Sequence, residues 1–176
     1  NRKIGGKEPV FIIAEAGVNH NGDLELAKQL VLEAKRCAAD CVKFQTFKTE
    51  NLVCKNAKTV KYQTQYVKRK QTQFNLLKKL EFSQTNHKKI IQYCKRKKIS
   101  YISSPFDLES LNLLFRLKIF DIKVASGEIN NYIFLRNLAK KAKKIFISSG
   151  MSTLNEVSRA IKILIENKGE YDEKNN

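Results

Sequence analysis

The chain contains five apolar runs, each ending in polar or charged residues, and this pattern constrains its fold more than any other feature. The runs span residues 11–17, 41–47, 100–106, 120–128 and 144–151. Helix-like sequence follows most of them. An order of strand, helix, strand, helix is typical of an α/β protein with a parallel sheet.

Polar side chains close each run, where parallel α/β folds carry their chemistry. They are Glu15, Asn19 and His20; Lys43 and Gln45; Ser103 and Ser104; Lys123, Ser126 and Glu128; and Ser148 and Ser149. In a (β/α)8 barrel all of these residues face one rim. A closed barrel takes about 250 residues, and this chain has 176. We therefore predict an incomplete TIM (β/α)8-type barrel with about five β/α units.

Both ends of the sequence look cut. The chain opens on Asn1, and a polar stretch over residues 169–176 stands where a sixth strand is expected. We interpret residues 1–176 as one partial barrel domain. The edge of its fifth strand then lacks the partner that a full barrel supplies.

The composition is typical of a cytoplasmic protein. No apolar run approaches the roughly 20 residues of a membrane span, and nothing near the start resembles a signal peptide. The cysteines fall at no metal-finger spacing, so we expect reduced structural thiols. They are Cys37, Cys41, Cys54 and Cys94.

The formal net charge is +17, from 34 Lys and Arg against 17 Asp and Glu. Such an excess attracts polyanions. The lysines, however, are scattered over helix faces and linkers, without the repeats of a nucleic-acid-binding module. We interpret them as solvated helix faces, and expect no nucleic-acid partner and no membrane partner.

Several helices can be placed from caps and apolar spacing. Asp23 and Asp107 are expected N-caps, and Thr153 with Glu156 forms a capping box before the last helix. A basic amphipathic helix carries Ile90, Ile91 and Cys94. Residues 48–82 form a long polar insertion that contains Tyr62 and a short helix around residues 74–80.

Lys43 and Lys123 sit inside otherwise apolar strands, where an unpaired ammonium is costly to bury. In the alternation of a strand, Lys43 and Gln45 share one face. Two lysines on neighbouring strand ends indicate a phosphate or carboxylate site. The alternative is a buried salt bridge to Glu15 or Glu128, which needs no substrate.

Glu15 ends an apolar strand and is a candidate acid or base. Glu128 follows Ser126 and a glycine that permits close backbone approach, and the serine hydroxyl can donate to an anion. His20 is either a ligand or a residue that fixes its loop. His87, on a helix, is expected to be exposed, so no metal site is predicted.

Five motifs stand in order along the chain. They read IAEAGVNHNG (13–22), VKFQT (42–46), SSPF (103–106), KVASGE (123–128) and SGM (149–151). Together they resemble the sialic acid synthase (NeuB) family over nearly the whole chain. The first motif, the Tyr62-Gln63 pair and residues 105–110 are most similar to the N,N'-diacetyllegionaminic acid synthase / N-acetylneuraminate synthase branch.

The resemblance implies a condensation of phosphoenolpyruvate with an N-acylated mannosamine-type aldose, which gives a nonulosonic acid and phosphate. By the matching motifs, Glu15 and Glu128 would serve catalysis. The residues implied in substrate binding are Lys43, Gln45, Ser104, Lys123, Ser126, Asn19 and Tyr62. Where Ser104 stands the family more often has Thr, which keeps the hydroxyl.

The resemblance also implies a divalent metal, Mn²⁺ or Mg²⁺, and a homodimer. The family's metal histidines lie in later His-Cys-Thr and Ser-Asp-His type motifs, and neither motif occurs in these residues. The later strands and the C-terminal antifreeze-like (SAF) domain are missing as well. We therefore expect the 176 residues alone to be inactive. The alternatives are a non-catalytic remnant of a disrupted gene, and another barrel lyase or aldolase that uses Lys123. Which amino sugar is used stays open.

Overall fold

The computed structural model describes residues 4–57 and 72–169. Within them, five parallel strands form one sheet in the order of the sequence. The strands are β1 (Ile13–Gly17), β2 (Cys41–Thr46), β3 (Ser100–Pro105), β4 (Asp121–Val124) and β5 (Lys144–Ile147). Each of the five apolar runs therefore contributes one strand, as predicted.

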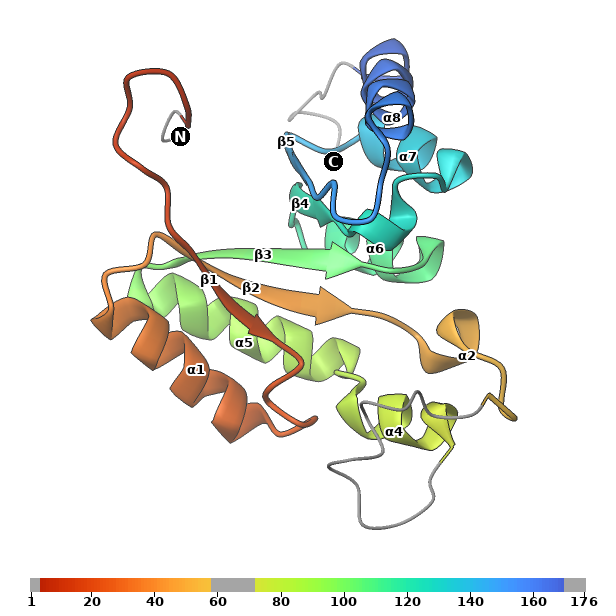
Figure 1. Cartoon of the computed structure of the whole chain (residues 1–176). Coiled ribbons are helices and arrows are strands. Elements are labelled where there is room, and N and C mark those ends of the chain that lie inside the picture. Colours follow the sequence, from red (N-terminus) through yellow and green to blue (C-terminus); the bar gives the residue numbers. More distant parts are fainter. Residues whose placement is uncertain (1–3, 58–71, 170–176) are drawn as a thin grey trace.

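Helices follow the strands and cover the outer face of the sheet (Figure 1). They are α1 (Leu24–Arg36), α5 (Gln84–Lys97), α6 (Leu108–Arg116), α7 (Tyr132–Ala139) and α8 (Leu154–Glu166). In Figure 1, α1 and α5 lie side by side against β1, β2 and β3. This is the arrangement of five consecutive units of a (β/α)8-type barrel, which confirms the predicted fold class.

The predicted helix starts are confirmed. Asp23 accepts hydrogen bonds from two backbone N–H groups of the first turn of α1. Asp107 accepts from the N–H and the hydroxyl of Ser110 in α6. Thr153 and Glu156 form the expected reciprocal capping box at α8. Such caps satisfy N–H groups that have no partner inside the helix.

Two parts of the fold differ from the sequence expectation. The fourth strand ends at Val124, and the 3₁₀ turn η1 (Ser126–Glu128) follows it. Helix α7 between β4 and β5 was not predicted.

In the long insertion, the structure adds the short helix α2 (Thr49–Leu52) and confirms a helix as α4 (Gln73–Leu80). Tyr62 lies outside the described residues.

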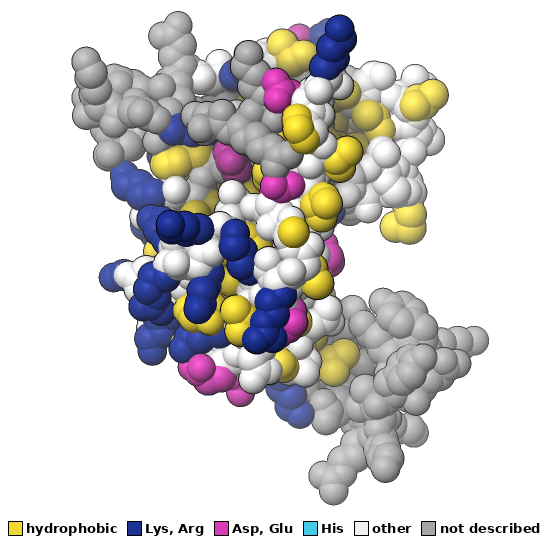
Figure 2. All heavy atoms as spheres, turned by 90° about the vertical axis from the view of Figure 1, so that its left-hand side faces the viewer, with side chains coloured by type: hydrophobic (Ala, Val, Ile, Leu, Met, Phe, Trp, Pro, Cys, Tyr) yellow, Lys and Arg dark blue, Asp and Glu magenta, His cyan; other side chains and the backbone are white. Residues whose placement is uncertain are grey.

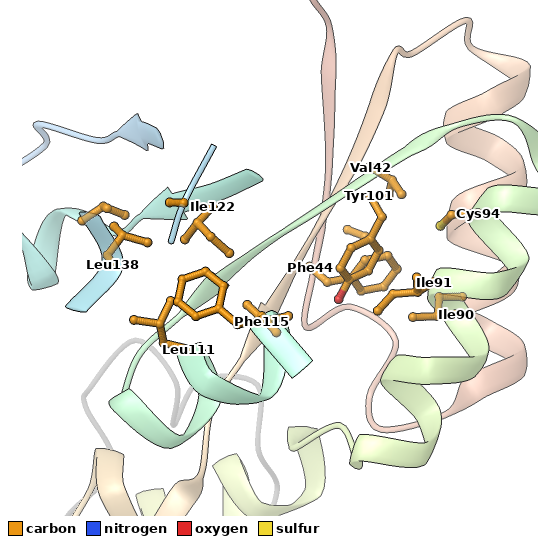
Figure 3. Close-up of a cluster of buried hydrophobic side chains, with 14 of the residues drawn as sticks. Val42, Phe44, Ile90, Ile91, Cys94, Tyr101, Leu111, Phe115, Ile122 and Leu138 are labelled. Carbon is orange, nitrogen blue, oxygen red and sulfur yellow. The ribbon is translucent and has the colours of Figure 1, made fainter. Parts of the chain in front are cut away.

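The core lies between the sheet and the outer helices (Figure 3). Phe44 of β2 stacks on Tyr101 of β3 with ring centroids 5.6 Å apart, and Ile90 of α5 is fully buried beside them. A second group joins Leu111 and Ile122 from α6 and β4. Burying each such side chain contributes about 1.5–3 kcal/mol, so these contacts fix the helices on the sheet.

The expectation that His87 is exposed was wrong. The side chain is fully buried, and its Nδ1 lies 3.1 Å from the Tyr101 hydroxyl. Its ring packs edge-on against Phe82. His87 precedes Ile90, Ile91 and Cys94 by three, four and seven positions, so it shares their inward stripe on α5.

Two further findings concern the outline of the molecule. None of the helices in the described ranges is long and apolar enough to cross a membrane. Within those ranges β5 pairs with β4 alone, and the expected lack of a further partner for the fifth strand stays a prediction. The expectation of later strands and an antifreeze-like domain outside this sequence stays a prediction.

Candidate active site

The centre of the predicted rim is an ion pair between Lys43 and Glu15. Glu15 on β1 stands in register with Lys43 on β2, and the Glu15 carboxylate contacts Lys43 Nζ. The lysine side chain is 11% exposed, whereas the glutamate side chain is 54% exposed. The pair therefore presents a largely desolvated cation beside a carboxylate that solvent or a substrate can reach.

Gly17 brings further groups to this pair. The pairing of β1 with β2 shifts register between Glu15 and Gly17, and Gly17 has a φ of +54°. A β-carbon at Gly17 would lie 3.2 Å from Glu15 Oε1 and 3.7 Å from Gln45 Nε2. The carboxylate and the amide of Gln45 thus converge where glycine leaves space.

Lys123 on β4 belongs to the same electrostatic group. The expectation that the two lysines lie on neighbouring strands was wrong, because β3 lies between β2 and β4. Burial lowers the pKa of Lys123, the charge of Lys43 lowers it further, and Glu15 acts in the opposite direction. Both lysines and the glutamate therefore interact across the inner face of the sheet. Two ammonium groups and one carboxylate leave a net positive charge for an anionic ligand.

Ser104 adds a hydroxyl beside this group. It stands in register with Gln45, and it is 1% exposed. Its Oγ has no hydrogen-bond partner among the described residues. Buried polar atoms are normally paired, so a ligand oxygen is a natural partner for this hydroxyl.

Ser126 and Glu128 lie on η1, directly after β4. A β-carbon at Gly150 would lie 3.9 Å from Ser126 Oγ, so the hydroxyl faces the loop after β5. The half-buried Glu128 accepts a hydrogen bond of 2.9 Å from Asn131 Nδ2. Of the two glutamates named in the salt-bridge alternative, Glu15 contacts Lys43, while Glu128 is held by Asn131.

Two residues of the first loop differ in exposure. Asn19 is exposed in the turn after β1, and its N–H donates to Ala16 O. His20 is fully buried, and its Nδ1 accepts a 3.0 Å hydrogen bond from the Gly22 N–H. Burial lowers the pKa of His20, so the neutral ring fixes the loop. Tyr62, the other implied substrate contact, cannot be placed because it lies outside the described ranges.

The described residues do not fit a divalent metal. Across residues 4–57 and 72–169, no group of three or more His, Cys, Asp or Glu side chains is arranged to hold one. A catalytic metal takes about three protein ligands. His20 Nδ1 and His87 Nδ1 face the Gly22 N–H and the Tyr101 hydroxyl. The Nε2 atoms of both rings have no hydrogen-bond partner among the described residues, but no carboxylate or thiol joins them in a ligand group there.

Sequence reasoning missed two residues that shape the site. Asn131 orients Glu128 and also caps α7 by accepting from the Phe134 N–H. An asparagine just before an apolar stretch is a cap signal that could have revealed it. At Gly17 the sequence indicates only the end of a strand, and its contact with the carboxylate depends on a bulge that sequence does not show.

The sequence matches a known protein family. A family model described as the NeuB family matches residues 30–174. The N,N'-diacetyllegionaminic acid synthase of Campylobacter jejuni is 45% identical over 157 residues, which cover 89% of this chain and 47% of that protein. The protein of the same name from Legionella pneumophila is 44% identical over 167 residues, which cover 92% of this chain and 47% of that protein.

The fold of this chain also matches a solved structure. The N-acetylneuraminic acid synthetase of Leptospira borgpetersenii superposes with a TM-score of 0.79 at 32% identity, and the match covers 97% of this chain and 55% of that one. The chain thus spans about half the length of the relatives that it matches.

Proposed function

Because this chain belongs to the NeuB family, we propose that its sheet carries the phosphoenolpyruvate-binding part of a nonulosonic acid synthase site. The synthase joins phosphoenolpyruvate to an N-acylated mannosamine-type aldose and releases phosphate. The names of the two relatives at 44–45% identity support the legionaminic acid branch. The resemblance to the family also implies that the whole enzyme would be a homodimer.

One observation carries the proposal. A buried, paired Lys43 lies within electrostatic reach of Lys123, and the unpartnered hydroxyl of Ser104 lies on a neighbouring strand. Phosphoenolpyruvate carries a carboxylate and a phosphate. Two cations with a hydroxyl donor match two anionic groups, since charge-assisted hydrogen bonds are the stronger ones.

The residues divide by task in the proposed reaction. Lys43 and Lys123 stabilise the two anionic groups of phosphoenolpyruvate through all steps. The neutral donors of the site orient the same groups, and Asn19 and Tyr62 contact substrate. These donors are Gln45, Ser104 and Ser126.

The chemistry forms one carbon–carbon bond. C3 of phosphoenolpyruvate attacks the aldehyde carbon, water adds at C2 and loses a proton, and the C2–O bond breaks to release phosphate. Glu15, exposed at the ion pair, and Glu128, oriented by Asn131, would exchange the protons with the aldehyde oxygen and the water.

No step is assigned to a metal, because the described residues form no three-ligand set. In longer family members we propose that Mn²⁺ or Mg²⁺ is held by residues outside this sequence. For the 176 residues alone we expect weak phosphoenolpyruvate binding and no turnover. Product formation by this polypeptide with Mn²⁺ present would show that expectation to be wrong.

Calorimetric titration of the chain with phosphoenolpyruvate at low salt tests the site. Lys43→Ala and Lys123→Ala should each weaken binding by at least about tenfold, equivalent to about 1.4 kcal/mol. The matched control is Lys162→Ala, which removes one charge from the exposed face of α8. Equal losses in all three variants, or no binding to folded wild type, would contradict the proposal.

A second candidate is an imine-forming lyase or aldolase, and one observation favours it. Burial and the neighbouring Lys43 lower the pKa of Lys123, which makes an amine more nucleophilic at neutral pH. Borohydride reduction in the presence of pyruvate would then attach the carbon skeleton to Lys123. The synthase route forms no imine, so an unmodified Lys123 rejects this candidate.

A further inference from the structure

Basic side chains gather at the end of the sheet opposite the candidate active site. Figure 2 views the left-hand side of Figure 1, where β2 and β3 begin, and Lys and Arg side chains crowd that face. They come from the ends of the helices and the loops that lead into the strands. Among them are Lys95 at the end of α5, Arg116 and Lys118 at the end of α6, and Lys141 before β5.

A cavity of about 490 Å³ opens at this end, where α6 finishes and β4 begins. Its volume is within the range of about 300–1,000 Å³ that small-molecule sites occupy. Within the described part of the chain, its six lining residues include three cations and no acid. They are Asn112, Phe115, Arg116, Lys118, Phe120 and Lys141.

The backbone around the cavity offers little negative charge to oppose an anion. The end of a helix normally presents unpaired carbonyl groups. At α6 the carbonyls of Leu113, Leu114 and Phe115 accept hydrogen bonds from the N–H groups of residues 117–119. Lys118 closes this turn with a φ of +61°. Asp121, the residue after Phe120, interacts electrostatically with Lys143 and Lys144, whereas Arg116, Lys118 and Lys141 line the cavity.

Two of the lining residues are aromatic. Phe115 and Phe120 stack with centroids 5.9 Å apart, and Lys143 Nζ lies 5.8 Å from the Phe120 centroid. A lining that combines aromatic rings with cations suits a ligand that has a carbon skeleton and a charged end.

We propose that this cavity binds a small organic phosphate, with the phosphate between Arg116, Lys118 and Lys141 and the carbon skeleton on Phe120. Arg and Lys are the residues that bind phosphate in proteins. The proposed synthase reaction does not use this cavity, because Phe120 precedes β4 while Ser126 follows it. The site lies at the N-terminal edge of the strands, and the chemistry lies at their C-terminal edge.

Calorimetric titration of the folded chain tests this site at about 50 mM salt, where surface charges are only partly screened. The probes are glucose 6-phosphate, adenosine 5′-monophosphate, inorganic phosphate and glucose. We expect saturable binding of at least one organic phosphate, tighter than that of inorganic phosphate, and none of glucose. Arg116→Glu and Lys141→Glu should each weaken it by at least about tenfold.

The matched control is Lys95→Glu, which changes the net charge equally at the same end of the sheet but lies outside the cavity. Binding should survive this change. If Lys95→Glu weakens binding as much as Arg116→Glu, the attraction is unspecific and the proposal is overturned. It is also overturned if no organic phosphate binds better than inorganic phosphate. Circular dichroism of each variant shows that the fold is kept.

Discussion

At Gly17 a single hydrogen atom in place of a side chain decides the geometry of the site. The residue has a φ of +54°, and a β-carbon in its place would lie only 3.2 Å from Glu15 Oε1. That carboxylate is the partner of Lys43. Any larger residue strains the backbone and also displaces the group that neutralises a buried cation.

We therefore expect Gly17→Ala to lower the free energy of unfolding by about 1–2 kcal/mol, the penalty for a β-carbon in this conformation. It should also weaken phosphoenolpyruvate binding. For stability the control is Gly127→Ala, because a β-carbon at Gly127 meets nothing within 4 Å. Urea unfolding of both variants checks the stability effect, and equal effects of the two substitutions would contradict it. Titration of Gly17→Ala against wild type checks the binding effect.

His87 gives the molecule a dependence on pH. Burial, the charge of His20 and the charge of Lys48 lower the pKa of His87 to about 3. The unfolded chain binds this proton near pH 6.5, whereas the folded chain does so only near pH 3. Stability from the neutral ring is thus complete above about pH 6.5 and is lost as the pH falls toward 3.

Between pH 6.5 and 5, we expect the free energy of unfolding of wild type to fall by up to about 1.4 kcal/mol per pH unit for each buried histidine. His87→Gln keeps a polar group near Tyr101 but cannot titrate, so its decline should be shallower. His20 titrates in both proteins. Parallel pH profiles of the two proteins would refute the role of His87.

The residues of the site show which parts can be read from sequence. Glu15, Lys43 and Lys123 could be placed together because strand alternation and parallel order are backbone rules. The Glu128–Asn131 hydrogen bond could not, because it depends on η1, a turn that the run of apolar residues concealed. His87 could have been predicted from its spacing to Ile90 and Cys94.

At the scale of elements, the carboxylate of one residue holds the insertion after β2 in place through hydrogen bonds. Glu81, at the end of α4, accepts hydrogen bonds from the Thr49 N–H and hydroxyl and from the ammonium groups of Lys48 and Lys78. Its side chain is 10% exposed. Burial alone would raise the pKa of Glu81, but these hydrogen bonds outweigh it and bring the pKa to about 2.

Because the folded pKa is depressed, this stability is present above about pH 4.5 and disappears as the pH falls toward 2. We expect Glu81→Gln to lower the free energy of unfolding at pH 7 by about 2 kcal/mol. Glu50→Gln is the control, since Glu50 is exposed and its ion pair within the described residues is with Lys78. Urea unfolding should give a lower free energy of unfolding for Glu81→Gln than for Glu50→Gln. A Glu81→Gln protein as stable as wild type would contradict this role of Glu81.

The elements also show where periodicity misleads. The five strands were found because apolar runs between turn signals are long enough to stand out. Helix α7 was overlooked because it is only eight residues long, and its opening apolar stretch from Tyr132 to Leu135 hides the helical spacing of its inward residues. Its N-cap Asn131 was the available signal. The burial of Phe134, Leu135 and Leu138 in the core stabilises this helix.

For the whole molecule, the excess of positive charge is the main feature that lowers stability. A net charge of +17 is carried by 176 residues, and many of the cations face one end of the sheet (Figure 2). Self-repulsion of like charges destabilises a compact state. The ion pairs on the helix surfaces, such as Lys28–Glu25 and Arg36–Glu33, contribute little by comparison.

Raising NaCl from about 20 to about 300 mM shortens the screening length severalfold. The melting temperature should therefore rise by a few degrees, as expected for about 1 kcal/mol in a chain of this size. Lys95→Glu should reduce this salt dependence, because it removes repulsion at the crowded end. A melting temperature that falls with salt would mean that surface ion pairs outweigh the repulsion.

The order of the strands sets the order of folding. Every strand of the described sheet pairs with the one that comes next in the chain, so a growing polypeptide can add each unit as it leaves the ribosome. The connection from β2 to β3 is the longest in the sheet, and loop closure becomes more costly with length. We therefore expect the pairing of Ser100 with Cys41 to be the slow event, after the first β/α unit of the nascent chain has formed.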